Sequence, residues 1–371
     1  MQQFINTNRK EIPPTFSQDA IFFHRQLPNY IPTPLVDWQV YASQHHLKNL
    51  FIKDESQRLG LKSFKGLGAS YAMFRILCER NHLDPQTTSL AKLRTMDHSK
   101  VTFVCASHGN QGVAIAWATS LFGCSSYLLM PKGSSKIYQN QIKRKNVQVV
   151  ITDGSYDQAI QKARAWAKDN DGILLQDIAW DGYTKIPTWI IEGYLTMAKE
   201  IQQQISTTPT HIFLQAGTGA MAGGMIDAFH HMYPKAQLII VQPISSPCLY
   251  VSMEQTKRSS VVCQPTIMTH LNRGIPCLIT WPIIQKQVNC ICICEDDAAI
   301  RGMHVLKTND IISGPSGALT MGLVDQIVKS DALRNQFQIQ QDASILLINT
   351  EGDTDPFLYQ SMVGEDRCLI I

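Results

Sequence analysis

Short apolar runs alternate with amphipathic stretches along most of the chain. In the first half, the runs that predict strands are 101–105, 126–130 and 147–151, and the stretches that predict helices are 111–122, 134–145 and 156–169. In the second half, the predicted strands are 211–215, 237–241 and 344–349, and the predicted helices are 220–231, 296–307 and 316–329. Apolar residues spaced at three and four distinguish the helices from the strands. This alternation predicts βαβ units, an α/β fold and mostly parallel sheets.

The two sets of strands are separated near residues 180–205, which predicts two domains. A chain of 371 residues is long enough for two such domains with real cores. The net charge of +3 is too small to favour nucleic acid or a membrane surface as a partner. No apolar run reaches the length needed to cross a bilayer.

The chain contains 10 cysteines, and its first residues lack the apolar core of an export signal. We therefore expect a cytoplasmic protein with free thiols. Cys290, Cys292 and Cys294 alternate with isoleucines, so a strand would place the three thiols on one face. A buried strand is the better interpretation, because zinc-binding pairs usually have two to four intervening residues. We expect no metal site.

Lys65 lies in an apolar, glycine-bearing stretch, 63–72, at the predicted start of a helix. Burial and the positive end of a helix both favour a neutral amine. A neutral amine can form a Schiff base with an aldehyde cofactor. A lone lysine of this kind is more often a surface residue whose stem covers apolar groups. Two further glycine-rich loops that fit the same chemistry favour the functional interpretation.

The first of these loops, 106–112, follows a predicted strand and precedes a predicted helix. Gly109 and Gly112 allow backbone amides to approach a ligand, and the helix N-terminus favours a carboxylate or a phosphate. Asn110 can donate a hydrogen bond to a phenolic oxygen. Taken alone, the motif is weak, and an ordinary strand-to-helix turn is the better interpretation of this loop.

The second loop, 215–224, also joins a strand to a helix. Its glycines do not have the spacing of a dinucleotide fingerprint, and no acidic residue ends the next strand, 237–241. A single phosphate group on a glycine cradle fits better.

Thr350 directly follows the buried strand 344–349. Open α/β sheets present ligand-binding groups at this end of their strands, so its hydroxyl can contact a ring nitrogen. A turn with helix-capping residues is the alternative.

Together these four elements resemble the fold-type II family of pyridoxal-phosphate (PLP) enzymes. The resemblance implies that Lys65 carries the cofactor, that Asn110 contacts its phenolic oxygen and that Thr350 meets its ring nitrogen. It also implies a phosphate loop made by Gly217, Thr218, Gly219 and Ala220. A neutral hydroxyl at the ring nitrogen leaves that nitrogen unprotonated, which suits β-elimination better than transamination.

The blocks 176–183, 185–190, 215–223 and 350–355 are similar to the signature of the diaminopropionate ammonia-lyases, and the similarity extends from about Phe22 to Tyr359. That family splits 2,3-diaminopropionate into pyruvate and two molecules of ammonia, and works as a homodimer. The resemblance implies two three-layer α/β/α domains with the cofactor in the cleft between them. The large cofactor-binding domain is expected at 1–61 plus 181–371, and the smaller substrate-closing domain at 62–180.

The resemblance also implies a substrate site. Asp177 is the candidate acid for the leaving group, although a structural hydrogen-bond acceptor after a strand is an equal alternative. The residues expected to bind the substrate are Ser107, Gly109, Gln111 and Tyr183.

The chain departs from the family at two positions. The family usually has an aspartate, an acid/base group for the D-isomer, where this chain has His108, and a glutamate where it has Pro315. An imidazole can replace the aspartate as a base, because its pKa lies near neutrality. Both changes remove an acid from loops that are expected near the cofactor.

The sequence thus predicts a PLP-dependent lyase that performs α,β-elimination on a small amino acid. The favoured substrate is L-2,3-diaminopropionate, because Lys65 remains the familiar base for the α-proton. The alternatives are a serine/threonine dehydratase-like activity, a β-replacement synthase, and a catalytically reduced homologue with a regulatory role.

Overall fold

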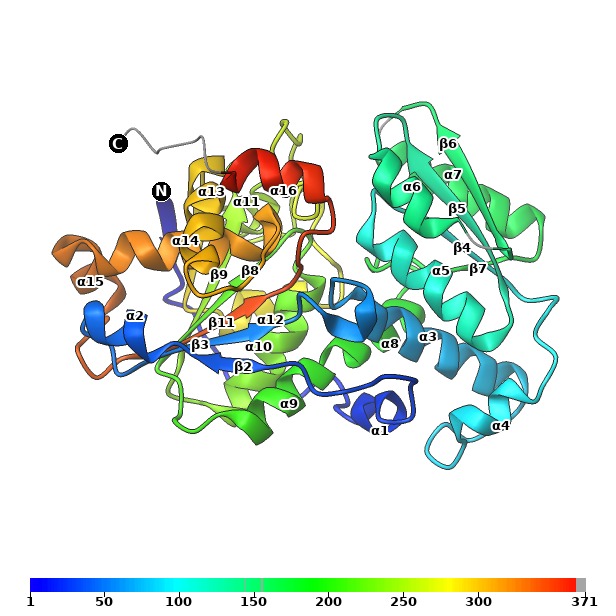
Figure 1. Cartoon of the computed structure of the whole chain (residues 1–371), viewed down its shortest axis with the longest axis horizontal. Coiled ribbons are helices and arrows are strands. Elements are labelled where there is room, and N and C mark those ends of the chain that lie inside the picture. Colours follow the sequence, from blue (N-terminus) through cyan, green and yellow to red (C-terminus); the bar gives the residue numbers. More distant parts are fainter. Residues whose placement is uncertain (144, 155, 365–371) are drawn as a thin grey trace. The chain divides into compact units, whose positions relative to one another are not determined.

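The computed structural model describes residues 1–143, 145–154 and 156–364, which fold as two compact units (Figure 1). Unit 1 comprises Met1–Phe16, Pro32–Arg58 and the chain from Met197 onward. Unit 2 comprises Ser17–Ile31 and Leu59–Thr196, and it contains the whole segment 62–180 that the sequence assigned to a smaller domain. No helix in the described part of the chain is long and apolar enough to span a membrane.

A seven-stranded sheet forms the centre of unit 1, in the order β1-β10-β9-β8-β11-β3-β2. Figure 1 labels its strands β9, β8, β11, β3 and β2. The strands are β1 Gln2–Ile5, β2 Leu35–Asp37, β3 Asn49–Asp54, β8 His211–Gln215, β9 Gln237–Pro243, β10 Cys290–Cys294 and β11 Ser344–Asn349. Only the two edge strands, β1 and β2, pair antiparallel to their neighbours. Every residue of β8, β10 and β11 is buried, so both faces of the sheet are covered.

Helices account for this coverage. The helices of unit 1 are α2 Gln39–Gln44, α9 Thr196–Gln204, α10 Ala220–Met232, α11 Cys248–Glu254, α12 Trp281–Gln287, α13 Asp296–Lys307, α14 Pro315–Val328, α15 Asp331–Phe337 and α16 Pro356–Val363. The three cysteines of β10 lie in the core cluster that includes residues of α13 and α14. The predicted buried strand is therefore confirmed, and it packs under these helices.

Unit 2 has a parallel four-stranded sheet in the order β6-β5-β4-β7. Its strands are β4 Thr102–Ala106, β5 Ser125–Pro131, β6 Val147–Thr152 and β7 Ile173–Leu174. Its helices are α1 Ala20–His24, α3 Lys65–Arg80, α4 Leu90–Arg94, α5 Asn110–Phe122, α6 Lys136–Ile142, α7 Tyr156–Asp169 and α8 Lys185–Tyr194, with a 3-10 turn at Arg58–Gly60. The predicted α/β class with mostly parallel sheets is confirmed.

Most predicted elements lie within one or two residues of those observed, and the exception is the helix predicted at 134–145. The observed helix α6 begins at Lys136, where the Ser135 hydroxyl accepts a hydrogen bond from the amide of Ile137, 3.3 Å away. It ends at Ile142, because Lys143 has a ψ of 111° and leaves the helical conformation. The apolar spacing did not reveal this early end.

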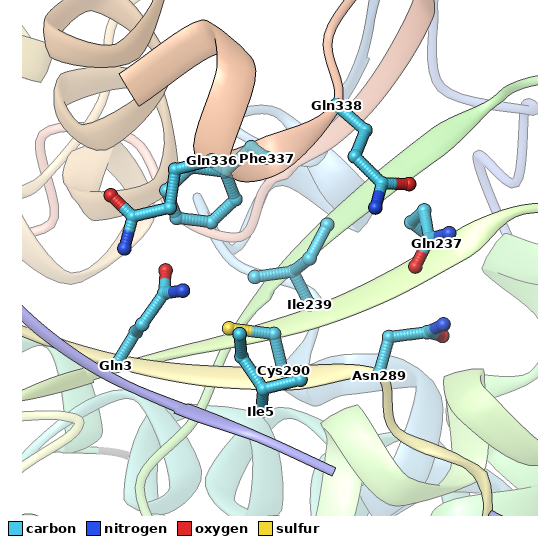
Figure 2. A pocket seen from close by; sticks show the side chains of 9 residues that line it. All are labelled: Gln3, Ile5, Gln237, Ile239, Asn289, Cys290, Gln336, Phe337 and Gln338. Atoms are coloured by element: carbon cyan, nitrogen blue, oxygen red, sulfur yellow. The ribbon is translucent and has the colours of Figure 1, made fainter. Parts of the chain in front are cut away.

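A small cavity of about 90 Å³ opens in unit 1 (Figure 2). Its lining residues are Gln3, Ile5, Gln237, Ile239, Asn289, Cys290, Gln336, Phe337 and Gln338. It lies where β9 and β10 begin, whereas open α/β sheets bind their ligands where the strands end. The polar lining and the buried Gln3 Oε1, which has no partner among the described residues, fit bound water better than a substrate.

Candidate active site

Lys65 is the first residue of α3, and its amine lies between a carboxylate and aromatic rings. The Lys65 Nζ donates to Asp177 Oδ2 at 2.6 Å and to the Tyr194 hydroxyl at 3.2 Å. It also lies 4.9 Å from the ring centroid of Phe64 and 5.2 Å from that of Tyr194. The Lys65 side chain is 20% exposed. The amine is therefore held in a defined direction and is still reachable by a small molecule.

The close packing of α3 against α8 brings Tyr194 to this amine. A methyl group at Gly193 would lie 2.7 Å from the Leu67 carbonyl oxygen, and one at Gly68 would lie 2.5 Å from the Tyr194 ring. Glycine at both positions lets the two helices approach. Burial raises the pKa of Tyr194 well above its usual value, and the charge of Asp177 raises it further, so the hydroxyl stays protonated.

Asp177 is held by the segment that carries it. The Gln176 side-chain amide accepts from the backbone N–H of Ala106 and donates to its carbonyl oxygen, both at 3.1 Å. The Tyr183 hydroxyl accepts a hydrogen bond from the backbone N–H of Gln176 at 2.9 Å, and it donates one to the Leu174 carbonyl oxygen at 2.8 Å. Burial raises the pKa of Tyr183, so this hydroxyl remains a donor. Tyr183 thus shapes the chain directly before Asp177.

The loop 106–112 lies next to Asp177, because its strand β4 is paired with β7 and parallel strands end at the same edge. The Ser107 hydroxyl oxygen accepts from the amides of Gly109 at 3.0 Å and Gly112 at 2.8 Å, which curls the loop into the start of α5. A methyl at Gly109 would lie 2.8 Å from the Tyr138 ring, so the close turn requires glycine.

Three predicted residues of this loop have distinct surroundings. The His108 ring stacks on Tyr156, with 4.9 Å between centroids, and the Tyr156 hydroxyl accepts from Gln176 at 2.7 Å. Asn110 is the first residue of α5 and is buried. The Gln111 side-chain amide is buried and has no hydrogen-bond partner among the described residues, so it is available to a ligand.

In unit 1 the loop after β8 fits a phosphate group. Gly219 precedes α10 with a φ of +83°, in the left-handed region that favours glycine. A methyl at Gly217 would lie 2.9 Å from the Leu271 carbonyl oxygen, so this position also requires glycine. The Thr218 hydroxyl oxygen accepts from the Ala220 amide at 3.3 Å.

The carbonyl groups of this loop are used by the protein itself. The Gly217 carbonyl oxygen accepts from Gln242 Nε2 at 3.0 Å, and that of Thr218 from the Cys277 amide at 2.8 Å. In the part of the chain that the structure describes, the amides of Gly217, Thr218 and Gly219 have no partner. Three amides at the N-terminus of a 13-residue helix form a cradle for an anion.

Thr350 belongs to the same edge of this sheet, because β11 is paired in parallel with β8. Gln215 Nε2 donates to the Thr350 hydroxyl oxygen at 3.0 Å and to the Ile348 carbonyl oxygen at 2.8 Å. Because the Thr350 oxygen accepts this bond, its own hydrogen remains for a further acceptor. A pyridine nitrogen is such an acceptor.

Pro315 is the first residue of α14, where a missing N–H costs nothing. The loop before it nevertheless touches a carboxylate, because a methyl at Gly314 would lie 2.6 Å from Glu351 Oε1. Glu351 is 3% exposed and its other oxygen bonds to His270 Nδ1 at 2.5 Å. The loop before Pro315 therefore still has an acidic neighbour, Glu351.

The structure brings Lys65 and Asp177 together in unit 2 and places the phosphate loop and Thr350 on one sheet edge in unit 1. The sequence interpretation missed three residues that orient these groups: Tyr194, Gln176 and Gln215. Their partners are distant in sequence, so no local motif marks them. Only the similarity of the blocks 176–183 and 215–223 to a family signature pointed to Gln176 and Gln215.

The site agrees with comparisons to known proteins. A family model described as pyridoxal-phosphate dependent enzyme matches residues 27–351. The diaminopropionate ammonia-lyase of Salmonella typhimurium is 37% identical over 371 residues, which cover 94% of this chain and 92% of that protein.

Solved structures give the same result. The chain matches the holo form of the Escherichia coli diaminopropionate ammonia lyase with a TM-score of 0.93 and 35% identity, over 98% of this chain and 96% of that one. It matches the same enzyme in complex with D-serine with a TM-score of 0.92 and 34% identity, over 98% and 97% of the two chains. The chain therefore belongs to the pyridoxal-phosphate-dependent enzymes and, within them, to the diaminopropionate ammonia-lyase family.

Proposed function

We propose that this chain is a PLP-dependent carbon–nitrogen lyase that converts 2,3-diaminopropionate to pyruvate and ammonia. The observation that carries the proposal is the pair formed by Lys65 and Asp177, an amine and a carboxylate 2.6 Å apart. This pair lies in a chain that is 37% identical to a diaminopropionate ammonia-lyase. An α,β-elimination needs a base for the α-proton and an acid for the leaving amine, and these two groups supply both roles.

Residues of unit 2 and, separately, residues of unit 1 each fit a part of the cofactor. Lys65 of unit 2 would hold it covalently. In unit 1, the amides of Gly217, Thr218 and Gly219 with the N-terminus of α10 would hold its phosphate, and the Thr350 hydroxyl would donate to its ring nitrogen. When bound, the cofactor absorbs the negative charge that develops at the substrate's α-carbon. Because Thr350 is a neutral donor, it would leave the ring nitrogen unprotonated, which favours elimination over transamination. Asn110, the first residue of α5, would contact the phenolic oxygen.

Proton movement follows from the position of the Lys65 amine. With the substrate bound, the Lys65 amine would take the α-proton. Asp177 Oδ2 lies 2.6 Å from the Lys65 Nζ and provides a short path for a proton to the departing β-amine. Tyr194 holds the Nζ from the other side at 3.2 Å without competing for the proton, because its hydroxyl stays protonated.

The substrate carboxylate is assigned to the loop 107–112. The side-chain amide of Gln111, which has no partner among the described residues, and the N-terminus of α5 supply donors there. Ser107, Gly109 and Tyr183 act on the substrate by shaping the backbone, since the Ser107 and Tyr183 hydroxyls are bonded to it.

Stereochemistry tests the proposal most sharply. His108 replaces the aspartate that the family uses for the D-isomer, so Lys65 is the principal base and the L-isomer is preferred. Pyruvate release is measured by coupled assay with L- and D-2,3-diaminopropionate. We expect turnover of the L-isomer, at least about tenfold slower turnover of the D-isomer, and loss of both pyruvate release and cofactor absorbance in Lys65→Ala.

Each other outcome points to one alternative. Pyruvate from neither isomer contradicts the proposed substrate. Keto-acid release from L-serine or L-threonine alone indicates a dehydratase, and release that needs a second nucleophile indicates a synthase. A coloured protein without turnover of any of these indicates a regulatory homologue.

We further propose a cytoplasmic homodimer, with a cofactor-binding unit 1 and a substrate-closing unit 2, near the predicted boundaries 1–61 plus 181–371 and 62–180. The nine cysteines among the described residues are all free thiols, which is typical of a reducing compartment. Light scattering of the holoenzyme tests the dimer, and cell fractionation tests the compartment. A monomeric mass, or export from the cell, contradicts the respective proposal.

A further inference from the structure

Unit 2 contains a second cavity, of about 610 Å³, that shares no lining residue with the candidate active site. It is enclosed by the segment around α1, by α3, by the loop before α4 and by α8. The lining residues that carry the argument are Asp19, Phe22, Tyr71, Phe74, Arg75 and Glu192. None of them has a role in the chemistry described above.

Arg75 is held rigidly at this cavity but is only partly used by the protein. Its Nη1 donates to the Tyr71 hydroxyl at 3.0 Å and lies 3.4 Å from Glu192 Oε2. Its guanidinium carbon lies 5.6 Å from the ring centroid of Tyr71 and 5.0 Å from that of Trp189. Among the described residues, the Arg75 Nε and Nη2 have no acceptor, and the side chain is 25% exposed. A fixed guanidinium with a free edge is suited to bind a carboxylate by two hydrogen bonds.

Two carboxylates give the cavity an excess of negative charge. Glu192 is buried, and Asp19 is exposed at the start of α1. Burial, opposed by Arg75, raises the pKa of Glu192, and the charge of Asp19 raises it further. A ligand whose carboxylate binds Arg75 therefore gains from carrying an ammonium group that faces these two acids.

Aromatic side chains complete the lining. Phe74 and Tyr71 are buried, whereas Phe22 is 63% exposed. A ligand with an apolar side chain covers the Phe22 ring and removes apolar surface from water. The cavity thus offers one cationic, one anionic and one apolar contact.

We propose that this cavity is a binding site for a free α-amino acid with a large apolar side chain. The amino acid's carboxylate pairs with Arg75, its ammonium group lies between Asp19 and Glu192, and its side chain packs against Phe22 and Phe74.

The two helices that line the cavity connect it to Lys65. Helix α3 begins at Lys65 and carries Arg75 about 15 Å further along its axis. Helix α8 carries both Glu192 and Tyr194. A ligand that draws Arg75 away from Glu192 changes the contact between the two helices, and this contact sets the distance between the Tyr194 hydroxyl and the Lys65 amine. The site therefore acts as an effector site for the proposed lyase.

The test is calorimetric titration of the holoenzyme with L-phenylalanine. The matched probes are 3-phenylpropionate, which lacks the ammonium group, phenethylamine, which lacks the carboxylate, and glycine, which lacks the apolar side chain. We expect L-phenylalanine to bind at least about tenfold more tightly than each of the three. Absence of binding at millimolar L-phenylalanine, or equal binding of all four probes, overturns the proposal.

Variants separate this site from the active site. We expect Arg75→Gln to abolish binding. We expect Asp19→Asn, at an exposed position, to weaken binding while folding and turnover without the probe stay unchanged. Binding that persists in both variants overturns the proposal, and so does binding that is lost in Lys65→Ala. Bound L-phenylalanine should change kcat/KM by about fivefold or more, and an unchanged value overturns the coupling through α3 and α8. Because calorimetry needs no turnover, failure of the proposed lyase reaction does not obscure the result.

Discussion

At the scale of single residues, the contact between Lys65 and Asp177 determines what the amine can do. The sequence interpretation considered only the burial of the amine and the helix N-terminus beside it. The structure adds a carboxylate at 2.6 Å and a hydroxyl at 3.2 Å. These two partners orient the Lys65 amine, and the Asp177 carboxylate provides a hydrogen-bonded path for proton transfer. Asp177 is therefore a hydrogen-bonded partner of the proposed base rather than only a structural acceptor after a strand.

We predict that Asp177→Asn lowers kcat by about 10²–10⁴ while the absorbance of the bound cofactor persists. The asparagine side chain has nearly the same shape as aspartate, but it cannot transfer a proton as an acid. Stopped-flow measurement of pyruvate release, together with the visible spectrum, checks this. The matched control is Asp181→Asn, four residues further along and exposed, which should leave kcat unchanged. An Asp177→Asn variant with nearly wild-type turnover would exclude Asp177 as the acid.

At the scale of elements, two helix arrangements build the site. Helix α10 begins after the amides of Gly217, Thr218 and Gly219, which have no partner among the described residues. The glycine spacing of this loop predicted that arrangement. The packing of α3 on α8 could not be predicted from the sequence. Nothing in the local sequence distinguishes Gly68 and Gly193 from other glycines, and they come into contact only when the two helices pack together. Their close contact carries Tyr194 to Lys65.

We predict that Gly193→Ala destabilises the protein by about 1–3 kcal/mol and also lowers turnover. The added methyl would lie 2.7 Å from the Leu67 carbonyl oxygen and 2.8 Å from Gly68 Cα, so backbone must move. Gly66→Ala is the control, since its methyl would meet the flexible end of Leu61, which can turn away. Urea unfolding of both holoenzymes measures the difference, and equal midpoints would contradict the packing argument.

At the scale of the whole molecule, a buried ionic cluster lies beside three of the four points at which the chain passes from one unit to the other. Its members are Thr33, Lys53, Glu55, Arg58 and Glu200. Arg58 donates to Glu55 Oε2 at 2.7 Å and to Glu200 Oε2 at 2.6 Å, and both partners are fully buried. The cluster thus ties together stretches of unit 1 that are far apart in sequence.

We predict that this cluster makes stability depend on acid pH. Burial alone would raise the pKa of Glu200, but the hydrogen bonds and charges of Arg58 and Lys53 lower it from 4.5 to about 2. A lowered folded-state pKa adds stability that is present above about pH 4.5 and is lost as the pH falls towards 2. The contribution is on the order of 3 kcal/mol at neutral pH.

Unfolding midpoints measured across this pH range test the prediction. Glu200→Gln should be less stable at neutral pH, because Arg58 loses a buried counter-charge, and its stability should fall less between pH 4.5 and 2. Glu254→Gln, at an exposed position, is the control and should follow the wild type. Parallel pH profiles for the wild type and Glu200→Gln would contradict the assignment.

The sequence by itself determined the elements and the chemistry that each loop offers. The strands 211–215 and 344–349 and the helix 296–307 follow from local periodicity, and they are observed with the same bounds. The glycine loop of Gly217 and the helix beginning at Lys65 are likewise encoded within a few adjacent residues. Such features are local because backbone geometry and helix dipoles act over a few residues.

Only the tertiary structure decided which side chains meet. Lys65 is 112 positions from Asp177 and 129 from Tyr194, and both contacts depend on how helices and strands pack. The assignment of Ser17–Ile31 to unit 2 depends on packing in the same way, because Phe23 stacks on Phe74 of α3, 4.4 Å between centroids. Packing of distant elements leaves no periodic trace in either segment, so the partners of Lys65 and the cavity at Arg75 became visible only in three dimensions.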